Sequence, residues 1–588
     1  MTMNAPNRNT LWATLLVEEL ARSGLTAASI APGSRSTPFA LAFEAHPDID
    51  VYLHDDERGA SFFALGMALA SGNPVAIVCT SGTATANFHP AIIEAFYSQV
   101  PLIVLTTDRP HEQRESGANQ TIDQVKMYGD HVLWSHEVAP PEADPPDRTL
   151  RYLRNLANRS MNLADGLRKG PVHLNIPFRK PLEPTEDPSD SVTNTGLGLK
   201  GRQDQPLTSF SKGSLILDES QVDTIATKIQ RTKRGLIVCG PRSPQGKFAE
   251  SVTTLSQATG FPILPDALSG VRFGPQTSEL VLGHYETFLR KFKPDVELIL
   301  RFGGMPVSKF LGDYLASATN AEQILISSHG VWEDPTFMVN EFIWTDPTSL
   351  CQQLTQKLES ASSSTDMAWV DALKEAERIC QSSVESELSE NFLEASVVLD
   401  VIEQLPDSAS LFMASSLPVR YLDQFAGPIK KPLRTFANRG ASGIDGTIAS
   451  AIGAAASLDG PMVLITGDLA FYHDMNSLLA LKKYDIKLII ILINNDGGGI
   501  FHRLPISKFE PPFNELFITP HGLNFEPVVK MFGLDYACVT QREALQTAFQ
   551  SALNSENSCV IEVPFDGEQN HQQHKQLMTR ILDQLKNT

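Results

Sequence analysis

Apolar positions along the chain switch repeatedly between helix-like and strand-like spacing. Apolar residues recur every three to four positions over residues 11–22 and 58–70, and each stretch ends at a Ser-Gly pair, a helix-stop signal. Short continuous apolar runs at residues 75–80 and 102–107 read as buried strands, with a helical stretch over residues 82–97 between them. This alternation predicts a doubly wound parallel α/β sheet.

The same alternation returns twice further along the chain. A second α/β block opens with a predicted strand at residues 235–239, and the last third has further elements: strands at 461–466, 487–494 and 559–563, and helices near 475–483 and over 543–554. Two stretches rich in Pro, Ser, Thr, Asp and Gly, residues 183–213 and 360–366, are typical of linkers. The chain therefore predicts three doubly wound parallel-sheet domains over residues 1–185, 186–365 and 366–588.

Composition narrows the class of protein. The net charge of −20 argues against nonspecific binding to nucleic acid or to an acidic membrane. The six cysteines are scattered without a CxxC pair, which disfavours a disulfide framework or a zinc site and predicts the reducing cytoplasm. No basic head precedes an apolar run at the start of the chain, so no signal peptide is expected. The longest apolar run, residues 488–493, is too short to span a bilayer.

Two polar pairs end neighbouring predicted strands in the last third. Gly467-Asp468 ends one strand and Asn494-Asn495 ends the next, with room for a helix between them, so both ends fall on the same edge of a parallel sheet. The glycines at 497–499 supply exposed backbone. One carboxylate, one amide oxygen and one backbone carbonyl suit Mg²⁺ whose other ligands are phosphate oxygens and water. An ordinary strand end with polar loops is the alternative.

This Gly-Asp and Asn-Asn pattern resembles the cofactor-binding signature of the thiamine-diphosphate (ThDP) enzymes, the family that includes acetolactate synthase and pyruvate decarboxylase. The resemblance implies Mg²⁺, with Mn²⁺ as a substitute, held by Asp468, Asn495 and the carbonyl of Gly497, and Gly467 close to the diphosphate. The chain departs from the family pattern at Leu469, where glycine is usual, and at the residue after the Asn pair, which is aspartate.

The cofactor also needs a carboxylate against N1′ of its aminopyrimidine ring, to favour the tautomer that deprotonates the thiazolium carbon. The resemblance assigns this role to Glu57, at the end of a predicted strand; Asp55 and Asp56 are its rivals, and a helix-stabilising acid is the alternative. By the same resemblance Ser81 and Gly82 line the cofactor. Ile444 would separate its two rings, with ordinary core packing as the alternative.

Further strings in both outer domains resemble the synthases of menaquinone and phylloquinone biosynthesis that join 2-oxoglutarate to isochorismate. The strings are residues 31–38, 55–59, 80–84, 108–110, 117–120, 438–446 and 499–501. Each substrate carries two carboxylates, and arginine offers each one a planar bidentate fork. The resemblance implies a set of substrate-binding residues: Ser34, Arg35, Arg109, Gln120, Ser416, Arg420, Arg439 and Phe501. Taken singly, an arginine could form a surface ion pair, as Arg420 with Asp423, and Phe501 could belong to the core.

The resemblance implies a transferase that removes CO₂ from 2-oxoglutarate and adds the succinyl carbanion equivalent to isochorismate in a 1,4-addition. It also implies a homodimer or homotetramer, with neither nucleic acid nor membrane as a partner. Another ThDP-dependent 2-oxo acid decarboxylase, an acetolactate synthase-like carboligase and a non-catalytic ThDP-binding protein are the alternatives. No catalytic histidine is expected, because protonation would quench the carbanion. Residues 235–246 lack the GxGxxG fingerprint, which disfavours a nucleotide-binding protein, and no FAD is expected.

Overall fold

The computed structural model describes residues 5–190, 193, 195–359 and 363–585. The chain divides into two compact units. The first consists of Met1–Lys212, Asn438–Leu458 and Asp474–Ile486, and the second of Gly213–Ala437, Asp459–His473 and Lys487–Thr588. Some of the predictions fall on residues outside the described ones. These are parts of both predicted linkers, at residues 191–192, 194 and 360–362, and residues 1–4 at the start of the chain, where no signal peptide is expected.

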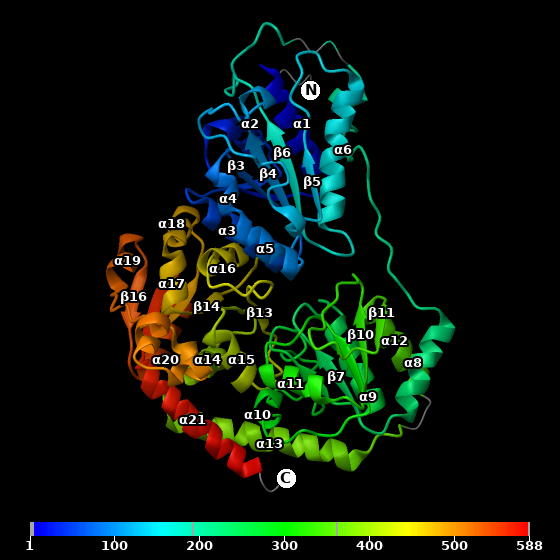
Figure 1. Ribbon diagram of the computed structural model, residues 1–588, viewed down its shortest axis with the longest axis vertical. Helices are drawn as coiled ribbons and strands as arrows, with labels where there is room; N and C mark the ends of the chain where they lie inside the picture. Colours follow the sequence, from blue (N-terminus) through cyan, green and yellow to red (C-terminus); the bar gives the residue numbers. More distant parts are fainter. Residues whose placement is uncertain (1–4, 191–192, 194, 360–362, 586–588) are drawn as a thin grey trace. The chain divides into compact units, whose positions relative to one another are not determined.

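Three sheets form the framework of the part of the chain that the structure describes, and their strand pairs there are all parallel (Figure 1). The first unit contains the sheet β2-β1-β3-β4-β6-β5, with β1 Ala27–Ile30, β2 Asp50–Leu53, β3 Val75–Cys79, β4 Leu102–Asp108, β5 Trp134–Glu137 and β6 Pro171–Pro177. The second unit contains two sheets. The central one, β11-β10-β9-β7-β8, has β7 Gly235–Cys239, β8 Ile263–Pro265, β9 Leu298–Phe302, β10 Glu322–Ser327 and β11 Glu341–Trp344. The third, β13-β12-β14-β15-β17-β16, has β12 Ser410–Met413, β13 Arg434–Phe436, β14 Met462–Gly467, β15 Ile489–Asn494, β16 Asp535–Cys538 and β17 Cys559–Pro564.

Helices connect the strands, as parallel pairing requires. The first unit has α1 Arg8–Arg22, α2 Thr37–Glu44, α3 Glu57–Ser71, α4 Thr83–Asn87, α5 His89–Ser98, α6 Asp147–Ala164, α7 Leu197–Lys200, α16 Thr447–Ala456 and α18 Leu479–Tyr484. The second has α8 Glu219–Arg231, α9 Phe248–Thr259, α10 Tyr285–Phe288, α11 Lys309–Ser317, α12 Pro347–Leu358, α13 Met367–Glu390, α14 Glu394–Gln404, α15 Leu417–Phe425, α19 Glu526–Met531, α20 Arg542–Asn554 and α21 Gly567–Gln584. A further helix, α17 Asp468–Asp474, follows β14 directly.

The predicted α/β class and its three parallel sheets are confirmed, and two helix predictions need correction. The helix expected over residues 82–97 is two helices, α4 and α5, with a break at Phe88. Pro90 lies in the first turn of α5 and has no N–H to continue the hydrogen bonds of α4. The helix expected near residues 475–483 is a 3₁₀ turn, Met475–Leu478, followed by α18. The three domain boundaries stay a prediction.

Glycines let two helices of the first unit pack at close range. A Cβ atom on Gly66 of α3 would lie 1.9 Å from the carbonyl oxygen of Ser450 in α16, and one on Gly453 of α16 would lie 1.9 Å from that of Phe63. Neither position can therefore carry a side chain in this packing. The contact fixes α3, which begins at Glu57, against the helix that follows residues 438–446.

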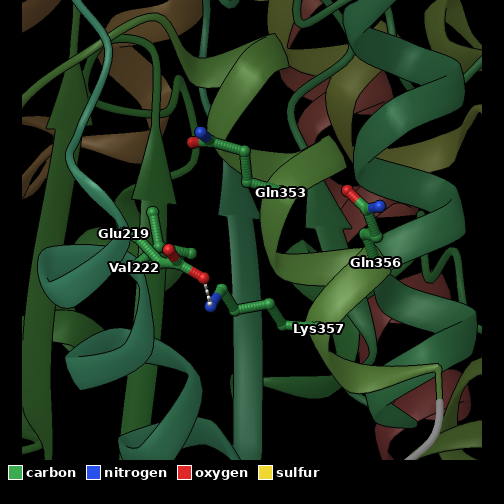
Figure 2. A pocket seen from close by; sticks show the side chains of 5 residues that line it. All are labelled: Glu219, Val222, Gln353, Gln356 and Lys357. Carbon is green, nitrogen blue, oxygen red and sulfur yellow. Dashed lines mark hydrogen bonds and ion pairs between the residues drawn. The ribbon is translucent and has the colours of Figure 1, made fainter.

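A pocket of 390 Å³ lies at α8 and α12 of the central sheet (Figure 2). It is lined by Glu219, Val222, Gln353, Gln356 and Lys357. Lys357 forms an ion pair with Glu219 at 3.2 Å, so the charges that line the pocket are paired with one another. None of the predicted site residues lines it. Within the described residues no helix is long and apolar enough to cross a membrane.

Candidate active site

The carboxyl ends of two neighbouring strands bring Asp468 and Asn495 together, as predicted. β14 ends at Gly467 and β15 at Asn494, and the strands pair in parallel with Gly467 opposite Ile493. Both strands are buried along their length, because they are continuous apolar runs of the kind that suits the centre of a parallel sheet. The first polar residues after them therefore emerge side by side at one sheet edge.

Backbone amides bind the Asp468 carboxylate in a defined orientation. Its Oδ1 accepts from the N–H of Leu469 at 2.7 Å, and its Oδ2 accepts from those of Asn495 and Gly497 at 3.1 and 2.9 Å. Burial raises the pKa of Asp468, and these hydrogen bonds together with His521 oppose the shift. The side chain is 2% exposed.

The residues at this edge fit a magnesium ion and a diphosphate. The Oδ1 atom of Asn495 is buried and has no hydrogen-bond partner in the described part of the chain, so a ligand can use it. Gly467 has no atom within 4 Å of the position its Cβ would take, which leaves space beside the backbone. Gly497 has φ 140°, and a Cβ there would lie 2.1 Å from the carbonyl oxygen of Ile518. Oxygen donors of these types are those that Mg²⁺ prefers.

Glu394, the first residue of α14, contacts Asn495 at the same sheet edge, although no motif in the sequence indicated it. Its Oε1 accepts from Nδ2 of Asn495 at 2.9 Å, and its Oε2 accepts from the hydroxyl of Tyr421 at 2.9 Å. Burial raises the pKa of Glu394, whereas the hydrogen bonds from Asn495 and Tyr421 and the charge of Arg503 lower it. A single acid at the start of a helix is common, so sequence reasoning had no reason to select it.

His521 is a second neighbour that the motifs do not include. Its Nε2 lies 3.3 Å from Oδ2 of Asp468, and its Nδ1 lies 3.4 Å from Oδ1 of Asp496. Asp496 also accepts from the backbone N–H groups of His521 and Gly522, at 3.0 and 2.7 Å. The segment around His521 is thereby tied to the turn that follows β15.

Ser416, Arg420 and Phe501 also lie in the second unit. Ser416 precedes α15 with φ 74° and ψ −127°, a conformation that non-glycine residues rarely adopt, and its carbonyl accepts from Nη1 of Arg420 at 2.5 Å. Phe501 is half-buried; its ring centroid is 5.5 Å from that of Phe517, and a Cβ on Gly498 would lie 2.6 Å from the Phe501 ring. Phe501 therefore packs on the turn after β15.

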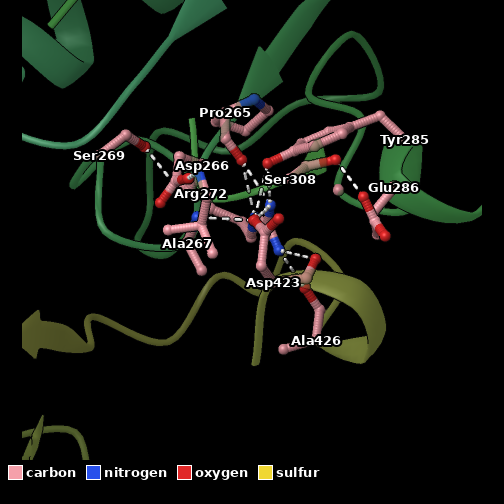
Figure 3. A network of polar contacts seen from close by, with 12 residues as sticks. Pro265, Asp266, Ala267, Ser269, Arg272, Tyr285, Glu286, Ser308, Asp423 and Ala426 are labelled. Carbon is pink, nitrogen blue, oxygen red and sulfur yellow. Dashed lines mark hydrogen bonds and ion pairs between the residues drawn. The ribbon is translucent and has the colours of Figure 1, made fainter. Parts of the chain in front are cut away.

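A buried ionic network fixes α15 to the central sheet (Figure 3). The guanidinium of Arg272 donates to Oδ1 of Asp423 at 2.6 Å and to the hydroxyl of Tyr285 at 2.8 Å. It also donates to the carbonyls of Pro265, at 2.8 and 2.7 Å, and of Ala426, at 3.1 Å. Asp423 is thus a partner of Arg272, and the predicted role of Arg420 stays a prediction beside its ion-pair alternative.

Two predicted substrate arginines lie together in the first unit. Arg35 belongs to the 3₁₀ turn after β1, which begins at Ser34. Arg109 follows β4 directly. Burial lowers the pKa of Arg35 to about 10; the charge of Arg109 adds to the shift and that of Asp108 opposes it. Nε of Arg35 is buried without a hydrogen-bond partner among the described residues. Two neighbouring cations with an unused donor favour an anionic ligand.

Ser81, Gly82 and Gln120 form a second cluster after β3. The Oγ of Ser81 donates to the carbonyl of Gln120 at 3.0 Å, and Nε2 of Gln120 donates back to the carbonyl of Ser81 at 2.9 Å. Gly82 has φ 87°, and its N–H donates to Oε1 of Gln124 at 3.0 Å. Gln124 is a further residue that no motif indicated.

The three acids at the start of α3 lie in different surroundings. Asp56 caps α3 by accepting from the N–H of Arg58 at 3.0 Å, and it also binds Asn476. Asp55 is exposed. Glu57 is half-buried in the first turn of α3, and its role as the activating carboxylate stays a prediction.

A buried acid, Glu94 of α5, holds the loop over residues 438–446, which carries Arg439 and Ile444. The Glu94 carboxylate accepts three successive backbone N–H groups, from Gly440 at 2.6 Å, Ala441 at 2.7 Å and Ser442 at 3.2 Å. Glu94 is 3% exposed. Because these partners lie almost 350 positions away along the chain, no local pattern in the sequence predicts this contact.

Comparison with known proteins accounts for this combination of residues. Three family models match in order: the N-terminal TPP binding domain of thiamine pyrophosphate enzymes over residues 12–127, the middle domain over residues 202–413 and the C-terminal TPP binding domain over residues 419–563. The chain belongs to the thiamine pyrophosphate enzyme family. Membership of that family confirms that the chain is a ThDP-dependent enzyme, and the relatives described next confirm its class as a transferase that forms a C–C bond.

Several similar relatives carry the name 2-succinyl-5-enolpyruvyl-6-hydroxy-3-cyclohexene-1-carboxylate (SEPHCHC) synthase. The protein of that name from Roseiflexus castenholzii is 49% identical over 567 residues, which cover 95% of this chain and 96% of the relative. Those from Haloquadratum walsbyi and Haloarcula marismortui are each 43% identical, covering 99% of this chain and all of the relative. The predicted resemblance to this branch of the family is confirmed.

Proposed function

We propose that the chain is a SEPHCHC synthase that uses ThDP and Mg²⁺ to convert 2-oxoglutarate and isochorismate into SEPHCHC and CO₂, in menaquinone or phylloquinone biosynthesis. The observation that carries the proposal is the identity of 41–49% to proteins of that name over nearly the whole chain. The predicted substrate-binding strings lie within the aligned length.

The chain's own residues supply a site for each part of the cofactor. Asp468, the Oδ1 of Asn495 and the carbonyl of Gly497 would bind Mg²⁺ at the edge of the third sheet, and Gly467 leaves space for the diphosphate. Glu57 would bind N1′ of the aminopyrimidine, with Ser81 and Gly82 nearby and Ile444 between the rings. When bound, ThDP supplies the electron sink for the carbon–carbon bond that breaks as CO₂ leaves.

The arginines would orient the substrates. The adjacent Arg35 and Arg109, with Ser34 and Gln120, would bind carboxylates at the edge of the first sheet. Arg439, Ser416, Arg420 and Phe501 would complete the substrate contacts. Each substrate has two carboxylates to be held: those of 2-oxoglutarate until one leaves as CO₂, and the remaining three while the new C–C bond forms. Fixed guanidinium groups do this without reorganisation during the reaction.

Assembly and location are part of the proposal. A homodimer or homotetramer follows from the resemblance, and sedimentation of the purified protein tests it. The six cysteines are free, five of them buried, which supports a cytoplasmic setting.

The decisive experiment supplies the purified chain with ThDP, Mg²⁺, 2-oxoglutarate and isochorismate and identifies the product by mass. We expect SEPHCHC and one CO₂ for each 2-oxoglutarate consumed. Replacing 2-oxoglutarate by pyruvate should abolish product formation, whereas an acetolactate synthase-like enzyme would accept pyruvate. CO₂ release at full rate without isochorismate would indicate a simple decarboxylase, and binding of ThDP without any CO₂ release would indicate a non-catalytic protein.

A further inference from the structure

The orientation of the Asn495 amide decides whether a metal ion meets an oxygen or a nitrogen. The two ends of an asparagine amide have nearly the same shape, so only their partners distinguish them. Nδ2 of Asn495 lies 2.9 Å from Oε1 of Glu394, and Oδ1 of Asn495 is buried without a hydrogen-bond partner among the described residues. The backbone N–H of the same residue donates to Asp468 at 3.1 Å, which places this amide beside the proposed metal ligand.

Glu394 is placed so that only one amide orientation is favourable. Glu394 is 1% exposed, and its carboxylate receives hydrogen bonds from two sides, from Asn495 at Oε1 and from the Tyr421 hydroxyl at Oε2. Its backbone N–H donates to Oδ1 of Asn570 at 3.1 Å, which fixes the start of α14. A reversed amide would set the Asn495 oxygen against a carboxylate oxygen, two acceptors without a proton between them.

We propose that Glu394 is a positioning residue for the metal site: by accepting from Nδ2 of Asn495, it directs Oδ1 of that amide toward the cation. The inference rests on the proposed binding of Mg²⁺ by Asp468, Asn495 and Gly497. Groups that orient metal ligands in this way contribute to metal affinity although they never touch the metal.

The test is Glu394→Gln, which keeps the volume but offers both a donor and an acceptor to Asn495. The probe is Mn²⁺ added to the apoprotein with ThDP, with free Mn²⁺ quantified by its electron paramagnetic resonance signal. We expect the dissociation constant for Mn²⁺ to rise about 10- to 100-fold, as for other residues that orient metal ligands. Tyr421→Phe is the matched control, because it removes the other partner of Glu394 and leaves the contact with Asn495, so the dissociation constant should stay near that of the unmodified protein.

A second pair of variants separates orientation from charge. Asn495→Asp replaces the amide by a group with two equivalent oxygens, which cannot be turned the wrong way. In that background Glu394→Gln should cause no further loss of Mn²⁺ affinity. An equal loss in both backgrounds would overturn the orienting role, because Glu394 would then act only through its charge.

The outcomes also separate this inference from the proposed function. If the unmodified protein fails to bind Mn²⁺ with ThDP, the metal site itself is wrong. If it binds Mn²⁺ and Glu394→Gln binds it equally well, the site stands and the positioning role is wrong. Thermal unfolding of each variant identifies any that lose affinity through misfolding.

Discussion

Unusual backbone conformations occur at or beside several residues proposed to bind cofactor, metal or substrate. Gln120, Ser416, Ser442 and Asp496 all have positive φ, between 55° and 74°, although none is glycine. Such conformations cost free energy and persist where the surrounding contacts impose them. At Gln120 the side chain turns back to donate to the carbonyl of Ser81, whereas the N–H of Ser442 donates to Glu94 from a distant part of the chain. The strain therefore coincides with the positions where exact backbone placement would matter.

Glu57→Gln tests the residue proposed to activate the cofactor. The amide keeps the size of the side chain but cannot exchange a proton with N1′, so turnover should fall by about 10²- to 10⁴-fold. Binding of ThDP, measured by quenching of protein fluorescence, should change little because Mg²⁺ and the diphosphate provide most contacts. Asp55→Asn is the control, since Asp55 is exposed, and should leave turnover unchanged. Full activity of the Glu57 variant would remove Glu57 from the reaction.

At the scale of elements, the sequence predicted what local pattern determines and missed what distant contacts determine. β14 and β15 were predictable because buried parallel strands are continuous apolar runs, and their polar ends were predictable for the same reason. The break at Phe88 depends on Pro90, a local signal that the apolar periodicity masked. Glu94 and Glu394 could not be predicted, because each is one acid on a helix, and the site residues that it contacts, Gly440 and Asn495, lie more than 100 positions away.

The helix α5 fixes the loop over residues 438–446 through Glu94, and Glu94→Gln tests that contact. The amide can accept on one oxygen only, so at least one loop N–H loses its partner, at a cost of about 1.5–3 kcal/mol for a hydrogen bond to a charged group. Because the loop carries Arg439, we expect the KM for a substrate to rise roughly tenfold, equivalent to about 1.4 kcal/mol, with a smaller change in kcat.

Ser98→Ala is the matched control for the Glu94 variant. Ser98 donates to the same carboxylate at 2.6 Å but is not part of the loop, so its loss should leave KM near that of the unmodified protein. Hydrogen exchange of the amides of residues 440–442 provides a direct readout and should accelerate in Glu94→Gln alone. Unchanged exchange at these amides would show that Glu94 does not restrain the loop.

At the scale of the whole molecule, the net charge is negative, but positive charges lie close together at particular sites. The chain carries 48 basic and 68 acidic residues, yet arginines adjoin one another at the edge of the first sheet and a fully buried arginine joins two sheets of the second unit. Arg272 is surrounded by acceptors and has no donor left for a ligand, so its role is structural. Its network fixes α15, the helix that begins next to Ser416 and carries Arg420.

The same network gives the second unit a predictable dependence on pH. Burial raises the pKa of Asp266 to about 7; the charge of Asp423 adds to the shift, and the N–H groups of Val307 and Leu268 and the charge of Arg272 oppose it. The folded protein therefore retains a proton on Asp266 that the unfolded chain has already released near its ordinary pKa of about 4. Folding is favoured by that proton, so this contribution to stability is complete below about pH 4 and is lost as pH rises toward 7.

Asp266→Asn removes this titration and should flatten the pH profile of unfolding. The variant loses one acceptor, because Asp266 accepts from Val307 at 2.7 Å and from Leu268 at 2.8 Å, so it should be less stable at every pH. The informative quantity is the difference in urea midpoint between the two proteins, which should be largest at pH 5 and shrink steadily toward pH 8. Asp407→Asn, at an exposed aspartate, should shift the midpoint equally at all pH values. A constant difference for Asp266→Asn would mean that this carboxyl is ionised in the folded protein throughout the range, and that Arg272 outweighs burial and Asp423 in setting its charge.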